Sequence, residues 1–583
     1  MAKLRDHLQP GGGESPILPP DQTPVYVPGE APLGTARKVR IVTIGAGVSG
    51  INMIRALRKH VTNYEHVVYE KNLKIGGTWF ENRYPGCKCD IPSHNYQLSW
   101  KPNHGWSSFF SPAPEIEEYL CRVCAEEDMA SEIKTQHKVI KAVWDESRGS
   151  WQLQIRDLKT GREFEDHAEF LLNASGVLND WKWPDIPGLH DFTGDLIHSA
   201  NWPENFSWAG KTVALIGNGS SGIQILPAIQ PDVKHLVHFV REPTWIVPPR
   251  IQTLLMGKAG SILDKIEMDA DGNFTPAQIE KFRADPSFYR TFVKAVEEEV
   301  NSNFPIVLKD TEYAQLIRRT LVEYMADALD GDEKLCKALI PDFPVGCRRL
   351  APGDDYLKSL RSPNVTVITS SITRVTPDGV ETSNGDVIKL DAIICATGFN
   401  VSFRPRFPII GREGNLQDIW ATDIPKSYMS CAVPTLPNYF TFLGPNAPVG
   451  HGSIFTIVEH VAKYIVRIIL KCQTEGIKAI APSKEAVAEF YEHIEAFMPR
   501  TAWASSCRSW FKDGKEDGPV VALHPGSRIH FFHMLEKFRG EDWEYVYLNS
   551  SGNRFHYLGN GFSLKELDGS DSTWYLDEPD KLP

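Results

Sequence analysis

The sequence predicts an α/β protein with two Rossmann-like dinucleotide-binding domains and a helical insertion. Two glycine-rich loops, each placed between an apolar strand and a helix, begin near residues 45 and 217. The stretch from about 251 to 340 is charged and has helical spacing instead. A chain of 583 residues is also too long for one hydrophobic core.

Composition and charge exclude several classes of protein. Hydrophobic residues make up 42% of the chain and charged residues 23%, which is ordinary for a globular protein. A formal net charge of −12 argues against nucleic acid or an anionic membrane as the main partner. No stretch reaches the roughly 18 uninterrupted apolar residues of a membrane span, and the N-terminus lacks an apolar signal region. We therefore expect a cytoplasmic monomer or homodimer.

The cysteines and carboxylates predict neither a disulfide framework nor a metal site. The 10 cysteines are sparse and irregularly spaced. Cys121 and Cys124 have the spacing of a redox pair, but they fall in mid-helix, where no helix start lowers a thiol pKa. The segment from Asp269 to Glu280 has a partial calcium-loop pattern, with Phe274 where the turn glycine is required.

The first glycine-rich loop, VRIVTIGAGVSG, follows a strand that ends at Ile44. Gly45, Gly47 and Gly50 allow a tight turn, close approach of a pyrophosphate and packing of helix on strand. The phosphates are expected at the helix N-terminus. Glu70 ends the next strand, 20 residues after Gly50, where a carboxylate can accept hydrogen bonds from ribose hydroxyls. These features together predict an adenine dinucleotide site.

The second loop, KTVALIGNGSSGIQ, has the same context. The strand after it ends in Arg241 instead of an acid, which suits the 2′-phosphate of NADP. An arginine that only caps the strand is the alternative. Glu242 follows directly, and a carboxylate beside a phosphate lowers affinity unless it points away. The predicted cofactor-binding residues of the loop are Gly217, Asn218, Gly219, Ser220, Ser221, Gly222, Ile223 and Gln224.

An acid-ended site followed by an arginine-ended site suggests FAD first and NADP second. By analogy with flavoproteins that bind two dinucleotides, the strand DAIICATGF is expected to return the chain to the flavin. We expect an N-terminal arm at 1–37, the first part of an FAD-binding domain at 38–188, an NADP-binding domain at 189–384 that holds the insertion at about 251–340, and the second part of the FAD-binding domain with a C-terminal substrate-side region at 385–583.

Between the two loops lies FTGDLIHSANWP, residues 192–203. It fits the pattern F-x-G-x-x-x-H-x-x-x-W-P at every fixed position, so the chain resembles Baeyer–Villiger monooxygenases of class I. The tail, NRFHYLGNG, looks more like the fungal members. The resemblance implies that FAD, NADPH and O₂ convert a ketone to an ester or lactone through a flavin C4a-peroxide. His198 of this motif is expected to act more as a conformational pivot than as a proton donor or acceptor.

Two further segments carry the resemblance and imply site residues. GGTWFENRYPGCKCDIPSHNY is similar to the family's flavin-contacting stretch, and FPVGCRRLAPGDDYL to its catalytic segment. Arg349 is then the catalytic arginine, Asp90 the carboxylate that orients it, and Arg348 a ligand of the NADP 2′-phosphate. GPNAPVGHGSIF and CRSWF are similar to later cofactor-side loops. The other cofactor-binding residues so implied are Thr78, Trp79, Phe80, Glu81, Lys88, Cys89, Tyr96, Ile454 and Trp510.

Three positions depart from the family's pattern. Arg348 stands where lysine is usual, Glu242 where a small hydroxyl residue is common, and Ala174-Ser-Gly176 where Ala-Thr-Gly is usual. The positive charge at the basic pair is kept.

The chemistry that the resemblance implies needs a fixed cation in a dry pocket. Arginine suits this role because it cannot lose its proton and offers a rigid fork of donors. A structural salt bridge is the alternative role for Arg349. A flavin monooxygenase of amines or sulfides would share both loops and is the alternative function. The helical insertion and the aromatic-rich C-terminal third favour a bulky, secondary-metabolite-like ketone.

Overall fold

The computed structural model describes residues 26–248, 262–269 and 271–577, and these form two compact units. The larger unit comprises Lys38–Leu470 and Ala479–Tyr545. The smaller unit comprises the described parts of 1–37 and 546–583 together with Lys471–Lys478. Each unit is described by itself.

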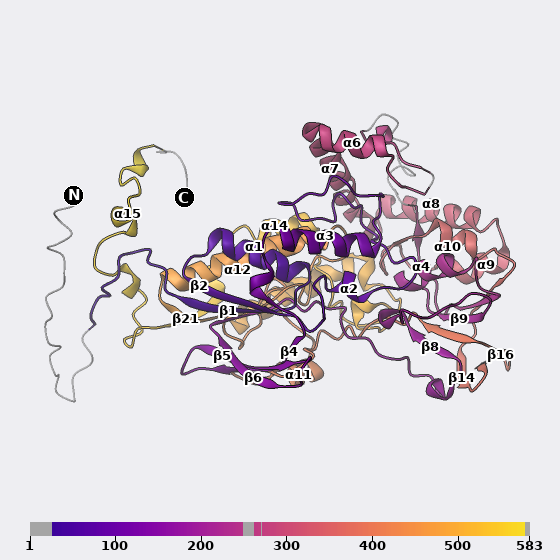
Figure 1. Cartoon of the computed structure of the whole chain (residues 1–583), viewed down its shortest axis with the longest axis horizontal. Coiled ribbons are helices and arrows are strands. Elements are labelled where there is room, and N and C mark those ends of the chain that lie inside the picture. Colours follow the sequence, from indigo (N-terminus) through magenta and orange to yellow (C-terminus); the bar gives the residue numbers. More distant parts are fainter. Residues whose placement is uncertain (1–25, 249–261, 270, 578–583) are drawn as a thin grey trace. The chain divides into compact units, whose positions relative to one another are not determined.

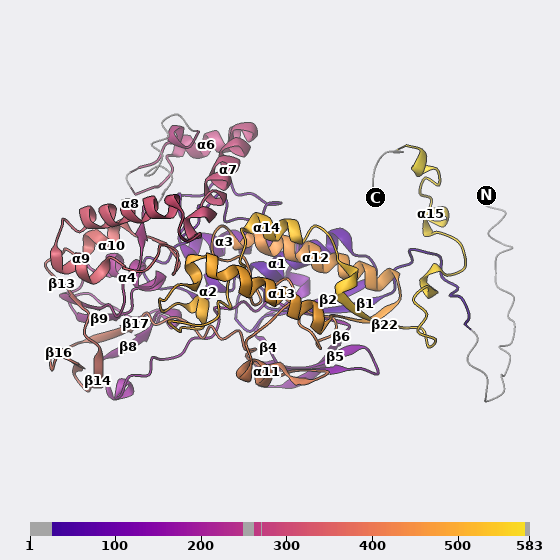
Figure 2. The same ribbon diagram turned by 180° about the vertical axis from the view of Figure 1, so that it is seen from behind.

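The first sheet of the larger unit is parallel, with the strand order β20-β7-β1-β2-β3. Its core strand β1 is buried along almost its whole length because both faces of the sheet are covered. Helices α1 and α12 lie on one face and a mostly antiparallel sheet on the other, as both views show (Figures 1 and 2). The elements are β1 (Val39–Ile44), α1 (Val48–His60), β2 (Tyr64–Tyr69), β3 (Ile133–Lys134), β7 (Phe170–Asn173), β20 (Tyr439–Thr441) and α12 (Ile454–Thr474).

The second sheet is also parallel, with the order β13-β10-β9-β17-β8. Helices α4, α10 and α8 cover one face of it (Figure 1). Each of the two parallel sheets contains a strand that is followed by a glycine-rich loop and a helix, which confirms the predicted fold class. The elements are β8 (Asp195–His198), β9 (Thr212–Ile216), α4 (Ser220–Ile229), β10 (His235–Phe239), α10 (Asp354–Ser359), β13 (Val365–Ile368) and β17 (Ala392–Cys395).

One predicted boundary is wrong. β17 lies beyond residue 384, yet it pairs with β9 and β8 and so belongs to the second sheet. The other domain limits stay predictions.

The insertion is helical, as its charge pattern predicted. Each of the four α-helices that the structure describes in it begins at a Thr or Asp whose side chain accepts a backbone N–H of the first turn. Its aromatic core encloses His94, whose ring lies 4.8 Å from that of Phe282 and 5.3 Å from that of Phe292. The elements are η5 (Ile262–Lys265), α6 (Pro276–Ala284), α7 (Pro286–Asn301), η6 (Phe304–Val307), α8 (Glu312–Ala328) and α9 (Glu333–Leu339).

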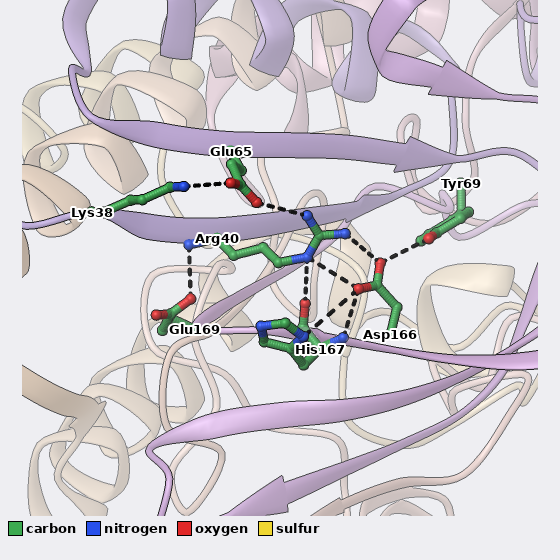
Figure 3. A network of polar contacts seen from close by, with 7 residues as sticks. All are labelled: Lys38, Arg40, Glu65, Tyr69, Asp166, His167 and Glu169. Atoms are coloured by element: carbon green, nitrogen blue, oxygen red, sulfur yellow. Dashed lines mark hydrogen bonds and ion pairs between the residues drawn. The ribbon is translucent and has the colours of Figure 1, made fainter.

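A mostly antiparallel sheet of order β19-β18-β4-β5-β6, in which only the β18–β4 pair is parallel, covers the lower face of the first sheet in Figure 1. Arg40 of β1 joins the two sheets (Figure 3), because its Nη2 lies 2.7 Å from Asp166 Oδ2 on β6. Tyr69 donates to the same oxygen at 2.8 Å, and Arg40 Nη1 also pairs with Glu65 at 3.2 Å. The strands are β4 (His137–Asp145), β5 (Ser150–Asp157), β6 (Glu163–Ala168), β18 (Ile409–Gly411) and β19 (Gly414–Asn415).

The remaining helices and strands follow in chain order, and α15 belongs to the smaller unit. They are α2 (Thr78–Glu81), α3 (Ala113–Glu126), β11 (Ile246–Val247), β12 (Ala351–Pro352), β14 (Ile372–Thr376), β15 (Gly379–Thr382), β16 (Val387–Lys389), α11 (Leu416–Thr422), β21 (Ile477–Pro482), α13 (Lys484–Phe497), α14 (Arg528–Met534), β22 (Trp543–Tyr547) and α15 (Leu564–Leu567). Among the described residues, none of the helices has the length and apolar character that crossing a bilayer requires.

The structure agrees with one expectation about the cysteines and adds a disulfide that the sequence did not predict. Cys121 and Cys124 lie on α3 away from its start, as expected, and Cys124 is buried in the last turn. A disulfide joins Cys347 to Cys507, which the irregular spacing did not predict because the two lie 160 residues apart.

In the smaller unit, the described part of the N-terminal arm pairs with the tail of the chain. Leu33 N donates to Phe562 O at 2.8 Å, and Leu564 N donates to Leu33 O at 2.9 Å. Arg37 N donates to Gln473 O at 3.2 Å. The sequence predicted the arm but not its partner.

Candidate active site

The two glycine-rich loops have the same local geometry. Gly45 has φ +102° and Gly217 has φ +103°, so both turns use a conformation that favours glycine. A Cβ on Gly50 would lie 2.0 Å from Gly45 O, and one on Gly222 the same distance from Gly217 O. The first glycine of each loop therefore makes the turn, and the third lets the helix pack on it.

The middle glycine of each loop leaves open space in front of a helix start. A Cβ on Gly219 would meet no atom within 4 Å, and one on Gly47 would come no closer than 3.5 Å, to Gly77 Cα. These two glycines are the N-caps of α4 and α1, and neither helix start has a side-chain cap or an acidic residue in its first turn. Their first N–H groups thus remain available for phosphate groups, and the site fits two dinucleotides.

One segment lies against each loop. DAIICATGF lies beside the second loop, because a Cβ on Gly217 would be 2.6 Å from Ala396 O. Its expected contact with the flavin stays a prediction. The corresponding neighbour of the first loop is Ala174, whose carbonyl oxygen would be 2.7 Å from a Cβ on Gly45.

Glu70 lies where the sequence placed it, directly after β2. It is 3% exposed, and its Oε2 accepts Ala46 N of the first loop at 2.7 Å. Its Oε1 accepts Asn72 N at 2.8 Å. Burial raises the pKa of this carboxyl, although the two N–H groups oppose the shift. Glu70 therefore anchors the loop at the position where a ribose would lie.

The remaining residues predicted for the second loop form the first turns of α4. Ser220 begins the helix, and Asn218 O accepts the Thr244 hydroxyl at 3.2 Å. Ile223 is only 2% exposed and packs in the core, so it can offer a dinucleotide its backbone but not its side chain. Ser221 lies on the same turn as Ser220.

Aromatic side chains line the predicted flavin side. The rings of Trp79 and Tyr96 meet edge to face at 5.5 Å, and Tyr96 lies 4.5 Å from Phe455. Cys89 is buried beside them, and burial raises the pKa of its thiol. Tyr96, predicted from the sequence, is thus packed between Trp79 and the start of α12.

The short helix α2 carries Thr78, Phe80 and Glu81. Thr78 is its first residue, and its carbonyl accepts Asn82 N at 3.0 Å. Glu81 is paired with Lys71 at 2.9 Å, and the Phe80 ring lies under the Arg83 guanidinium at 5.4 Å. Glu81 and Phe80 therefore have structural partners of their own.

The segment around Lys88 joins the two predicted cofactor sites. Gln224 of α4 donates to Lys88 O at 2.9 Å and accepts Lys88 N at 3.3 Å. Tyr84 also donates to Gln224 Oε1 at 3.0 Å. Gly86 approaches so closely that a Cβ on it would lie 2.5 Å from Gln224 O. Gln224 thus ties the nucleotide helix of the second site to the flavin-side segment.

Arg349 and Asp90 form a two-pronged ion pair, as predicted. Arg349 Nε donates to Asp90 Oδ2 at 2.6 Å, and Nη2 donates to Oδ1 at 2.8 Å. Arg349 Nη1 also donates to Val449 O at 3.1 Å. Burial raises the pKa of Asp90, but the charge and hydrogen bonds of Arg349 outweigh it and the net pKa is lowered. Both groups are therefore charged.

Glu242 follows β10 closely in the chain, and Arg348 of the basic pair contacts it there. Glu242 points toward Arg348 and forms an ion pair with it. Arg348 Nη1 donates to Pro243 O at 3.2 Å, and its guanidinium lies 5.3 Å from the Phe343 ring. Arg241 is close enough that its charge lowers the pKa of Arg348, after the larger effect of burial. The structure brings Arg241, Glu242 and Arg348 close together, and their role as cofactor ligands stays a prediction.

His198 is not brought to Arg349 by any contact among the described residues. It is 1% exposed and stacks on Trp181 at 4.6 Å. Its Nδ1 accepts Ala200 N at 3.2 Å, and its Nε2 lies 3.2 Å from Thr397 Oγ1. Burial lowers its pKa to about 4. A neutral ring whose two nitrogens are both engaged favours the pivot interpretation over proton transfer.

A cavity of about 160 Å³ opens at the Arg349–Asp90 pair. The insertion forms one wall of it, and its other walls are mostly apolar. Its lining includes Phe109, Phe110, Val247, Val300, Val307, Arg348, His451, Trp503 and Phe511. Residues 249–261, which follow Pro248 in this lining, lie outside the described residues, so the volume refers to the described walls.

Several residues of this cavity were missed by sequence reasoning. His451 lies inside the quoted GPNAPVGHGSIF segment, and burial, Arg528 and Arg349 together lower its pKa to about 4. Trp503 and Phe511 line the cavity, whereas the predicted Trp510 does not and packs 4.8 Å from Phe511. Ile454 begins α12, and its neighbour Phe455 makes the contact with Tyr96. No metal-binding cluster of His, Cys, Asp and Glu occurs within the described ranges.

The chain is similar to known proteins along most of its length. Residues 43–112 match the family described as NAD(P)-binding Rossmann-like domain. The chain is 37% identical to the FAD-binding monooxygenase tazF of Aspergillus terreus over 548 residues, which covers 93% of this chain and 95% of that protein. It is 30% identical to a Baeyer–Villiger monooxygenase of Streptomyces coelicolor, covering 85% of this chain and 90% of that one.

The solved structures that it matches lead to the same group of proteins. A crystal structure of cyclohexanone monooxygenase from Rhodococcus bound to NADP⁺ is 26% identical, with a TM-score of 0.72. That match covers 88% of this chain and 99% of the other. A closed crystal structure of cyclohexanone monooxygenase is 27% identical, with a TM-score of 0.72, and covers 88% of this chain and 100% of the other.

Proposed function

Because the chain belongs to the family of FAD-binding monooxygenases that includes the Baeyer–Villiger enzymes, we propose that it converts an apolar ketone to an ester or lactone. The reaction consumes NADPH, a proton and O₂ and releases NADP⁺ and water, and one oxygen atom enters beside the carbonyl carbon. The observation that carries this proposal is Arg349, fixed by Asp90 at the mouth of a mostly apolar cavity.

The two loops suit the two cofactors. FAD would lie on the Gly45–Gly50 loop with Glu70 at its ribose, and NADPH on the Gly217–Gly222 loop with Arg241 and Arg348 at its 2′-phosphate. The uncapped helix starts and the open middle glycines support both placements. When bound and reduced by NADPH, FAD supplies the electrons that activate O₂.

Arg349 has donors to spare for the reaction. An arginine carries five N–H groups, and three in Arg349 are used by Asp90 and Val449. Two are left to hold the negative charge that develops on oxygen as the ketone carbonyl is attacked. Asp90 positions the fork, and it keeps Arg349 charged because a carboxylate beside a guanidinium favours the ionised form of both.

His451 adds no second cation at neutral pH, because its pKa of about 4 leaves the ring uncharged. The charge that faces substrate oxygen therefore comes from Arg349. The mostly apolar walls exclude water. A dry site strengthens the attraction between Arg349 and the negative charge on substrate oxygen, and it limits the release of reduced O₂ as H₂O₂.

The lining of the cavity bears on the kind of substrate. Its described walls are mostly apolar, which supports an apolar ketone. A bulky, secondary-metabolite-like ketone stays a prediction. A cytoplasmic location and a monomeric or homodimeric state stay predictions.

The test is product analysis with ¹⁸O₂. We expect ketones from a panel of rings and bulky polycycles to gain one labelled oxygen atom in an NADPH-dependent reaction, with one NADPH consumed per ester. Sulfides and amines are assayed in parallel. Oxygenation of these heteroatoms without any ester from ketones would contradict the proposal.

A further inference from the structure

Glu242 presents a problem for a phosphate site. It follows Arg241 directly, at the position where a dianionic phosphate has to bind. Yet its carboxylate does not point away: Oε2 forms an ion pair with Arg348, and Oε1 lies 3.4 Å from Arg508 Nε. One carboxylate thus bridges two arginines that come from distant parts of the chain.

The position of Arg508 is fixed covalently. The Cys347–Cys507 disulfide joins the residue before Arg348 to the residue before Arg508. On its other side, Arg508 Nη1 donates to Gly514 O at 3.3 Å. The side chain of Arg508 is 44% exposed, so its guanidinium can also be reached from solvent.

Positive charge exceeds negative charge in the cluster formed by Arg241, Glu242, Arg348 and Arg508. Arg241, Arg348 and Arg508 bring three positive charges, and Glu242 supplies one negative charge. The three guanidinium groups interact, since the pKa of Arg348 falls to about 10 through burial and then through Arg241 and Arg508. In addition, Arg348 Nε is buried without a hydrogen-bond partner in the described structure. The cluster has two positive charges in excess, and a free donor, for an anion.

We propose that Arg508 is a third ligand of the 2′-phosphate of NADPH and that Glu242 holds Arg348 and Arg508 in place until the phosphate displaces it. A phosphate monoester carries about −1.5 to −2 charges near pH 7 and three acceptor oxygens, so it can replace one carboxylate between two guanidinium forks. This inference rests on the proposed use of NADPH, and it explains how a glutamate can be tolerated in such a site.

The experiment compares binding of NADP⁺ and NAD⁺ to the FAD-loaded enzyme by calorimetry. For Arg508→Ala we expect the Kd of NADP⁺ to rise about tenfold, which is about 1.4 kcal/mol, while the Kd of NAD⁺ changes less than about twofold. Arg508→Lys should recover part of the loss. Glu242→Gln should tighten NADP⁺ and leave NAD⁺ unchanged, because an internal competitor for the phosphate has been removed.

Two further variants test position and charge separately. Arg500→Ala removes an exposed arginine of the same region that lies over Phe497, and it should leave both dissociation constants unchanged. Cys507→Ser removes the covalent link and should weaken NADP⁺ more than NAD⁺. FAD content and melting temperature show which variants are folded.

The outcomes separate this inference from the proposed function. If the unmodified enzyme shows no preference for NADP⁺ over NAD⁺, the assignment of NADPH is wrong. If the preference exists and Arg508→Ala weakens both nucleotides equally or neither, Arg508 is not a phosphate ligand. If Glu242→Gln weakens NADP⁺, Glu242 supports binding and the exchange is refuted.

Discussion

Replacing Arg349 by alanine tests the catalytic assignment most directly. The change removes the two N–H groups that remain for the substrate and also leaves Asp90, which is 23% exposed at its side chain, without its partner. Losing a donor that stabilises developing negative charge usually lowers the rate about 10²–10³-fold. We therefore expect ester formation to fall at least that far, while FAD stays bound because its expected contacts come from other segments.

Two related variants show how much of the rate depends on the shape and the orientation of the Arg349 guanidinium. Arg349→Lys should recover less than about tenfold, because an ammonium group has three donors and no planar fork to match both Asp90 and the substrate. Asp90→Asn keeps the shape but loses the charge, so Arg349 is held less firmly. Its effect on rate should be smaller than that of Arg349→Ala.

The assay measures NADPH consumption, ester and H₂O₂ in the same reaction. For Arg349→Ala we expect any NADPH that is still consumed to appear as H₂O₂ rather than ester. Arg162→Ala, which removes an exposed arginine on the antiparallel sheet, serves as the matched control. Ester formation by Arg349→Ala within about twofold of the unmodified enzyme would refute the assignment and leave Arg349 as a structural ion pair.

Three further predictions follow from other parts of the larger unit. Glu70→Gln should weaken FAD binding about tenfold, because glutamine keeps one acceptor oxygen and turns its NH2 group toward the second backbone N–H; FAD content unchanged after gel filtration would contradict this. Asp166→Asn should lower the free energy of unfolding by about 1–3 kcal/mol at pH 7, because its carboxylate accepts from Arg40. Burial raises the pKa of Asp166, but Arg40 and Tyr69 lower it overall. The stability that the ionised carboxylate contributes is therefore present above about pH 4 and is lost as the pH falls through the folded pKa. Urea unfolding at pH 7 and pH 3 should show the difference in stability between the unmodified protein and Asp166→Asn shrink at the lower pH. Because the pKa values of His198 and His451 are about 4, neither ring should cause a transition in kcat/KM between pH 5 and 8; a transition near pH 6.5 that His451→Asn removes would disprove this.

The parts of the fold that depend on local pattern could be predicted from the sequence. Both glycine-rich loops, the strands before them and the acid or arginine that ends the next strand are set by residues within about one βαβ unit. The helical insertion likewise follows from charge and periodicity. The structure places Gly45, Glu70, Gly217 and Arg241 in these roles within the fold.

What could not be predicted depends on contacts between distant segments. Strand order decided that β17 joins the second sheet, and an apolar strand before Ala-Thr-Gly carries no mark of its sheet. The Cys347–Cys507 link spans 160 residues, and neither cysteine has a neighbour in sequence that indicates the pair. His451 was inside a quoted motif, yet only the fold shows that it is buried and near enough to Arg528 and Arg349 for their charges to lower its pKa.

The adjacent pair Arg348-Arg349 connects the two halves of the proposed reaction. Arg348 contacts Glu242 and Pro243 of the second nucleotide-binding region, whereas Arg349 contacts Asp90 and Val449. One dipeptide thus presents one guanidinium to each site, and the disulfide at Cys347 restrains the chain directly before it. Because the two arginines are adjacent, a variant that displaces Arg348 should also disturb the Arg349–Asp90 pair. We therefore expect Glu242→Ala, which removes the ion-pair partner of Arg348, to lower the rate of ester formation as well as to change the Kd of NADP⁺.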